Sequence, residues 1–146
     1  LFFLREDAMA EVNADELENA MILMDGTVGA EAWVCRKTGT IYMRSDMLDV
    51  PEPVPDDVDD EDKYVPVPGL KRLDLGQALV FDFVDEHMPD AEDEVRQFFR
   101  RSGAYRRFSN LVHGRGLTDR WHAFRDERTQ TAMREWCEDN GLKLSA

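Results

Sequence analysis

The hydrophobic pattern of the first third of the chain changes from helical to extended. Apolar side chains recur at three- and four-residue spacing over residues 13–24, which predicts an amphipathic helix capped by Asn13. The segments 31–36 and 40–44 are instead rich in residues that favour strands, and they flank a short connection containing Gly39. They predict a β-hairpin, because glycine readily adopts the positive φ that tight turns need.

A third strand is expected beside this hairpin, since two strands alone are only marginally stable in water. The segment 64–67 is the nearest candidate, and Pro66 and Pro68 would confine it to a sheet edge because proline donates no backbone hydrogen bond. Before it, positions 46–63 hold nine acids, three prolines and the single cation Lys63. Burial cannot offset the ordering entropy of such a stretch, so we predict a solvated loop.

From residue 74 onward the spacing of apolar side chains is helical throughout. Asp74, with a glutamine three residues later, predicts a capped helix that runs to about His87 and has a wide apolar face. Further helices are expected over residues 89–102, 104–112 and 118–140, because glycine or proline marks the breaks between them.

These elements predict an α+β fold. An N-terminal helix and β-hairpin are followed by an acidic loop and a C-terminal cluster of about four helices. We expect a single domain over residues 1–146, with the helix, hairpin and loop in 13–68 and the helical cluster in 74–141.

Composition restricts the class of protein. The chain has 146 residues, and its 31 acidic and 18 basic side chains give a net charge of −13. No apolar run approaches the ~20 residues that cross a bilayer, so no membrane association is expected. A core of this size needs no disulfide or metal, so we interpret Cys35 and Cys137 as small buried thiols in a reducing cytoplasm. The chain begins with Leu1 rather than methionine, so the sequence does not determine whether its native N-terminus is complete.

Positive charge is concentrated in the C-terminal helices. Residues 96–136 contain ten arginines, no lysine and four acids, a net charge of +6. The interleaved aromatic rings recur at core-facing spacing, so we expect buried rings and an exposed surface of guanidinium groups. The predicted core rings are Tyr105, Phe108, Trp121, Phe124 and Trp136, and the predicted binding residues are Arg106, Arg107, Arg120 and Arg125.

This charge pattern favours a small, non-enzymatic interaction or scaffold domain that binds a protein partner or a second copy of itself. One alternative is an enzyme that clamps an anionic small molecule with Arg106, Arg107 or Arg125 and uses Asp126 or Glu127 as acid or base. The other is a nucleic-acid-associated regulator, which the net charge of −13 disfavours because it repels a polyanion.

Searches for catalytic, metal and cofactor motifs give no candidate residue. No zinc-ligand spacing and no phosphate-binding glycine loop occurs in the sequence. An EF-hand loop counted from Asp57 would place Asp62 at the position of the turn glycine and Pro68 at that of the bidentate glutamate. The histidines each stand alone near a predicted helix end: His87, His113 and His122. We therefore predict no catalytic residue, no metal site and no cofactor.

Three strings in the C-terminal half resemble a known bacterial family: GAYRRFSN from Gly103, WHAFRDE from Trp121 and EWCEDNG from Glu135. They are similar to the uncharacterised protein family number 158 of the UPF series, whose members look like this along nearly the whole chain. The amino half is similar too, with a helix over 17–24 and a hairpin turn in which the family usually has an acid and this chain has Lys37. The resemblance implies the same fold in a family without an established activity or catalytic residues.

Overall fold

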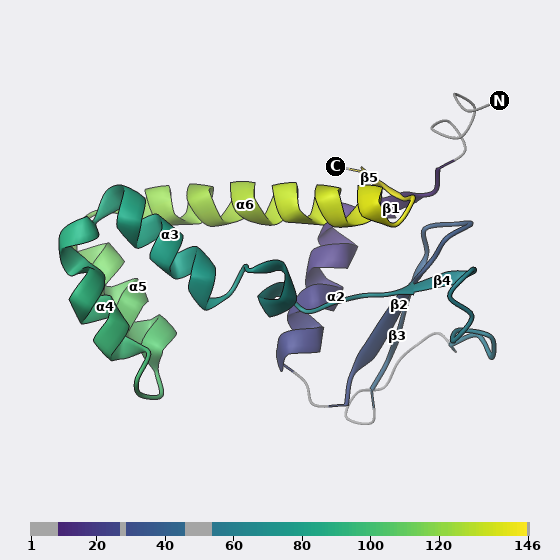
Figure 1. Ribbon diagram of the computed structural model, residues 1–146, viewed down its shortest axis with the longest axis horizontal. Coiled ribbons are helices and arrows are strands. Elements are labelled where there is room, and N and C mark those ends of the chain that lie inside the picture. Colours follow the sequence, from purple (N-terminus) through teal and green to yellow (C-terminus); the bar gives the residue numbers. More distant parts are fainter. Residues whose placement is uncertain (1–8, 27–28, 46–53, 146) are drawn as a thin grey trace. The chain divides into compact units, whose positions relative to one another are not determined.

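The computed structural model describes residues 9–26, 29–45 and 54–145, and it contains both helices and small β-sheets, an α+β protein (Figure 1). The chain divides into two compact units, which we describe one at a time. Unit 1 comprises Leu1–Leu73 with Gln130–Ala146, and unit 2 comprises Asp74–Thr129. The first part of the predicted acidic loop, 46–53, lies outside the described residues. None of the helices in the described ranges is long and apolar enough to cross a membrane.

The main sheet of unit 1 is antiparallel. Strands β2 (Glu31–Cys35) and β3 (Ile41–Arg44) form the predicted hairpin, and β4 (Tyr64–Pro66) pairs with the other side of β2. The strand order β3-β2-β4 puts the proline-containing strand at an edge, as predicted. Proline is tolerated there because the edge needs no donor from it.

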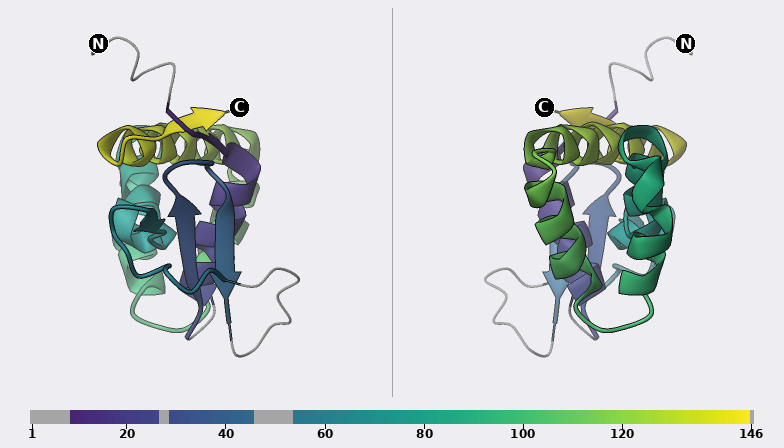
Figure 2. Two further views of the ribbon diagram at one scale, coloured as in Figure 1. Left: turned by 90° about the vertical axis from the view of Figure 1, so that its right-hand side faces the viewer. Right: turned by 90° about the vertical axis from the view of Figure 1, so that its left-hand side faces the viewer.

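Helix α2 (Ala14–Gly26) packs against this sheet (Figure 2). The side chain of Asn13 accepts a hydrogen bond from the Glu16 amide at 2.9 Å, which confirms the predicted cap. The largest fully buried side chains of unit 1 come from the helix, the sheet and both ends of the chain: Val12, Leu17, Met21, Val34, Met133 and Leu142.

A second, two-stranded sheet joins the two ends of the described chain. Strand β1 (Glu11–Asn13) runs parallel to β5 (Lys143–Ser145), with Val12 opposite Leu144. The hairpin turn lies so close to β1 that a Cβ atom on Gly39 would collide with the Glu11 carbonyl. Gly39 also has a φ of +77°, so both the turn and this close approach require glycine.

The described part of the acidic loop, 54–63, is more ordered than predicted. Backbone hydrogen bonds close its turns, and the Arg36 amide donates to the Lys63 carbonyl at 2.8 Å. Val58 is only 4% exposed, so an apolar anchor offsets part of the ordering entropy. The acidic side chains themselves are exposed, as predicted. The described part of the predicted loop is therefore a series of hydrogen-bonded turns anchored by Val58.

Unit 2 is helical, but it ends at Thr129, whereas the helical cluster was predicted over 74–141. It contains α3 (Gln77–His87), α4 (Glu92–Phe98), α5 (Ala104–Gly114) and the first part of α6 (Thr118–Asp139). The 3-10 turn η2 (Pro89–Ala91) precedes α4, and a second such turn in unit 1, η1 (Leu70–Leu73), precedes the cluster. The predicted capping box of α3 is wrong, because Gly76 is its N-cap residue and Asp74 lies in the preceding turn with a φ of +60°.

The core of unit 2 is built around the ring of Phe83. The rings of Trp121 and Phe124 lie at 5.2 and 5.3 Å from it, and the ring of Phe108 lies at 6.3 Å. Phe108 and Trp121 are buried, which confirms them as core residues, whereas Phe124 is half-buried. Trp136, in unit 1, is half-buried against that unit's core.

The prediction of a buried Tyr105 is wrong. Its side chain is 50% exposed, although its ring centre lies 5.3 Å from that of Phe99 in a T-shaped arrangement. The face of α5 that turns inward carries Ala104, Phe108 and Val112, at intervals of four residues. A residue one position after Ala104 is rotated away from that face.

Candidate functional site

The strongest concentration of positive charge surrounds the connection between α4 and α5. Residues 96–115 contain six arginines and no acid. Arg96 donates to Glu92 at 2.8 Å, and Arg115 makes a bidentate pair with Asp90 at 2.7 and 2.9 Å. Hydrogen bonds from Arg115 lower the pKa of the Asp90 carboxyl. These contacts leave four arginines with no ion pair to any residue that the structure describes: Arg100, Arg101, Arg106 and Arg107.

We call these four residues the α4–α5 arginine surface. Helices α4 and α5 pack against each other, and the chain reverses between them at Gly103, whose φ is +80° (Figure 1). This reversal brings the end of α4 close to the first turn of α5. Arg101 and Arg107 thereby line one pocket of about 260 Å³, together with Gln97 and Phe98.

The sequence predicted only part of this site. Arg106 and Arg107 lie in the first turn of α5, as expected, and Arg107 is half-buried. Arg101 and Gln97 were not predicted as binding residues. The signal in the sequence was the pair of double arginines on either side of Ser102 and Gly103.

The other two predicted binding residues lie elsewhere in unit 2. Arg120 and Arg125 are exposed on α6, and neither lines the α4–α5 pocket. Arg125 lies 3.7 Å from the carboxylate of its neighbour Asp126. The structure therefore brings Arg107 together with Arg101 rather than with Arg120 or Arg125.

The α4–α5 pocket suits an anion that offers several oxygen atoms. Each guanidinium presents a planar fork of N–H donors, and the Gln97 amide adds further hydrogen-bonding capacity. Phe98 is half-buried and supplies an apolar wall. The lining residues that the structure describes include no carboxylate, imidazole or thiol, the groups that most often serve as acid, base or nucleophile.

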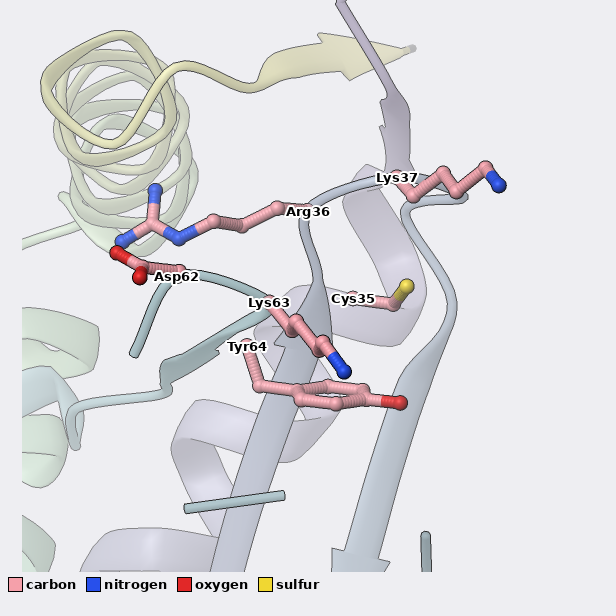
Figure 3. A pocket seen from close by; sticks show the side chains of 6 residues that line it. All are labelled: Cys35, Arg36, Lys37, Asp62, Lys63 and Tyr64. Carbon is pink, nitrogen blue, oxygen red and sulfur yellow. The ribbon is translucent and has the colours of Figure 1, made fainter. Parts of the chain in front are cut away.

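A second cationic pocket, of about 420 Å³, lies in unit 1 beside the hairpin turn (Figure 3). Its lining residues are Cys35, Arg36, Lys37, Asp62, Lys63 and Tyr64. In Figure 3 the Lys63 side chain extends between Cys35 and Tyr64, whereas the Arg36 guanidinium points away from Cys35. We call this site the hairpin pocket. It was not predicted, because it depends on the pairing of β2 with β4.

Two of the three cations that line the hairpin pocket, Arg36 and Lys63, have partners within unit 1. Arg36 donates to the Glu61 carbonyl at 2.9 Å and to the Asn140 carbonyl at 2.8 Å. The Lys63 ammonium lies 3.1 Å from the Asp57 carboxylate. Arg36 thus connects the hairpin, the acidic turns and the end of α6, and its charge serves the fold.

The hairpin pocket contains a thiol with an altered pKa. Burial acts to raise the pKa of Cys35, but hydrogen bonds from Thr38 and Lys37 stabilise the thiolate, and the net effect is a lowered pKa. Cys35 is half-buried, so the prediction of two buried thiols holds only for Cys137. At Cys137 burial raises the pKa to about 11.

The described residues contain no group of three or more histidine, cysteine or acidic side chains that could hold a metal ion. His87 is half-buried with its ring 4.7 Å from that of Phe83, and His113 and His122 are exposed. The histidines therefore form no cluster.

Comparison with known proteins adds no assignment, because no family model, no curated protein and no solved structure matches the chain. The resemblance to the bacterial family stays a prediction. The proposed function therefore rests on the side chains that line the two pockets.

Proposed function

We propose that the protein is a non-enzymatic interaction domain whose α4–α5 arginine surface binds an acidic segment of a partner protein. One observation carries the proposal: in a chain with 31 acids, these four neighbouring arginines have no ion pair among the described residues, and two of them line a pocket. Guanidinium groups without internal partners can form charge-assisted hydrogen bonds with the carboxylates of another chain.

The contrast with other arginines of unit 2 supports this proposal. Arg115 is held by Asp90, and Arg128 lies 3.2 Å from Asp82 with its guanidinium over the Phe124 ring at 4.6 Å. Carboxylates of unit 2 therefore neutralise these two arginines. Because 96–115 has no acid, the four arginines of the α4–α5 arginine surface have no carboxylate within their own segment to neutralise them.

Two alternative functions remain less supported. An enzyme acting on an anionic small molecule would need an acid or base beside its arginine clamp, and Asp126 and Glu127 lie on α6 rather than in the lining of the α4–α5 pocket. A nucleic-acid-associated regulator is favoured by one observation, the exposed ring of Tyr105 next to Arg106, since exposed rings can stack on bases. The net charge of −13 opposes it.

Fluorescence anisotropy with a labelled glutamate-rich peptide tests the proposal. We expect binding at low salt that weakens as ionic strength rises, because exposed charges are screened. The double variant Arg101→Gln/Arg107→Gln should lose about tenfold or more in affinity, which corresponds to about 1.4 kcal/mol. The matched control Arg120→Gln/Arg125→Gln removes the same charge elsewhere on unit 2 and should change affinity by less than about twofold.

Equal losses in the two double variants would refute a specific site, because they would show that only net charge matters. Tighter binding of a single-stranded oligonucleotide than of the peptide would favour the nucleic-acid alternative. Self-association that the arginine variant abolishes, measured by analytical ultracentrifugation, would identify a second copy of the chain as the acidic partner.

A further inference from the structure

We infer that the α4–α5 pocket accepts the phosphoryl group of a phosphorylated residue in the partner segment, an inference that rests on the proposed function. Arg101 and Arg107 line one small space together with Gln97 and Phe98. The partner class is thus a phosphorylated protein segment, rather than a segment that is only acidic.

Charge balance favours a phosphoryl group over a carboxylate. Two arginines line the pocket, Arg100 and Arg106 flank it in sequence, and no acid occurs over 96–115. A glutamate side chain brings one negative charge, whereas a phosphorylated side chain carries about −1.5 to −2 at neutral pH. One phosphoryl group can therefore neutralise both lining guanidiniums, and a single carboxylate cannot.

The number of donors leads to the same ligand. A phosphoryl group offers three strongly accepting oxygens, and a carboxylate offers two. Gln97 lies on α4, Arg101 in the connection that follows it, and Arg107 in the first turn of α5. Donors from three separate positions of the chain suit a group with three acceptors, because each donor can contact a different oxygen.

The pocket is small. Its volume of about 260 Å³ lies below the roughly 300–1,000 Å³ typical of pockets that enclose a whole small molecule. One side chain with its terminal anion fits such a space. The ring of Phe98 can contact the aliphatic part of that side chain, while the rest of the partner segment lies across the surrounding arginines.

Part of the pocket is held in place by the core of unit 2. Arg107 is half-buried and directly precedes Phe108, which is 1% exposed and lies 5.0 Å, ring to ring, from Trp121. Phe98 packs against the same core. A pocket held in its bound geometry loses less entropy on binding than one formed by free surface side chains.

The test compares three labelled peptides that share one sequence, in which a central serine between flanking glutamates is phosphorylated, unmodified or replaced by glutamate. We expect the phosphorylated peptide to bind about tenfold more tightly than the glutamate peptide, because it adds both charge and an acceptor oxygen. Inorganic phosphate should compete with the phosphorylated peptide.

Two variants test the arginine forks. Arg101→Lys and Arg107→Lys each keep the positive charge but lose the planar fork, so each should reduce the preference for the phosphorylated peptide. Arg120→Lys, on α6, is the matched control and should leave that preference unchanged. Circular dichroism establishes that each variant is folded. Because Arg101 is exposed, its substitution by lysine should not disturb the core.

The outcomes separate this inference from the proposed function. Equal affinity for the phosphorylated and glutamate peptides would overturn the phosphoryl inference and leave an acidic partner in place. If none of the three peptides binds, both proposals fail. A phosphate preference that survives in both lysine variants, or stronger binding to vesicles of anionic phospholipid than to the phosphorylated peptide, would also overturn the inference.

Discussion

The hairpin pocket and the α4–α5 pocket are both lined by cations, but they differ in what those cations contact. In the hairpin pocket Arg36 is bound by the carbonyls of Glu61 and Asn140, and Lys63 is paired with Asp57. In the α4–α5 pocket Arg101 and Arg107 have no ion pair within the part of the chain that the structure describes. A cluster of positive side chains is therefore evidence for a binding site only after its internal partners have been identified.

The comparison predicts different consequences of mutation. Loss of Arg36 from the hairpin pocket should destabilise the fold, whereas loss of an arginine from the α4–α5 pocket should weaken binding and leave stability nearly unchanged. Surface charges without defined partners contribute little to the free energy of unfolding.

The largest expected effect is on the scaffold beneath the α4–α5 pocket. Trp121→Ala removes an 8% exposed ring that packs on Phe83 and Phe108, and it should lower the free energy of unfolding by about 3–5 kcal/mol. Urea denaturation followed by circular dichroism measures this. Trp136→Ala, at a half-buried position, is the control with a smaller expected loss. A wild-type midpoint for Trp121→Ala would contradict a buried role for this ring.

The next effect distinguishes the two pockets directly. Arg36→Ala removes two charge-assisted hydrogen bonds to backbone carbonyls, so it should lower the free energy of unfolding by about 2 kcal/mol. Arg101→Ala, the matched change in the α4–α5 pocket, should alter it by less than about 0.5 kcal/mol. Urea denaturation of both variants tests the difference, and equal midpoints would show that the two pockets use their arginines in the same way.

These contrasts show which features could be predicted from sequence. Helix α2, the β2–β3 hairpin and the edge strand β4 follow from local pattern, because capping, turn and proline rules act over a few residues. The pairing of β1 with β5 could not be predicted, since two three-residue strands at opposite ends of the chain carry no periodic signal.

The candidate site could be predicted only in part, for the same reason. Arg107 was expected on a binding surface, but the pocket that it lines with Arg101 depends on where α4 ends, and α4 ends at Phe98 rather than at Ser102. Tyr105 was misplaced because a shift of one position on a helix rotates a side chain by about 100°. The hydrogen-bonded turns of 54–63 could not be predicted from composition. They depend on one buried residue, Val58, and on hydrogen bonds from Arg36.

The two cysteines should differ in their reactivity toward an alkylating reagent. Because its pKa is lowered, Cys35 should be alkylated by iodoacetamide at a lower pH than an ordinary thiol, and its rate should stop rising once the thiolate is fully formed. Cys137 is fully buried with a pKa of about 11, so it should stay unmodified in the folded protein. Mass spectrometry of labelled peptides measures both. Equal labelling of the two cysteines would contradict the environment of the hairpin pocket.

The smallest expected effect concerns the paired arginine next to the α4–α5 pocket. The pKa of Asp90 is lowered in the folded state by Arg115, so this pair stabilises the protein above the unfolded-state pKa of about 4. That contribution should disappear as the pH falls through the lower folded-state value. Thermal melts of Arg115→Gln and the wild type should therefore differ slightly at neutral pH and converge in acid. A difference that grows in acid would contradict the pair.

The most direct test of the central claim uses the arginine side chains themselves as probes. In nitrogen-15-labelled protein, the Nε–Hε resonances of individual arginines can be followed while an acidic, phosphorylated peptide is added. We expect the resonances of Arg101 and Arg107 to shift with the peptide and the resonance of Arg36 to stay in place. Shifts at Arg36 without shifts at Arg101 and Arg107, or uniform shifts over all arginines, would contradict the central claim.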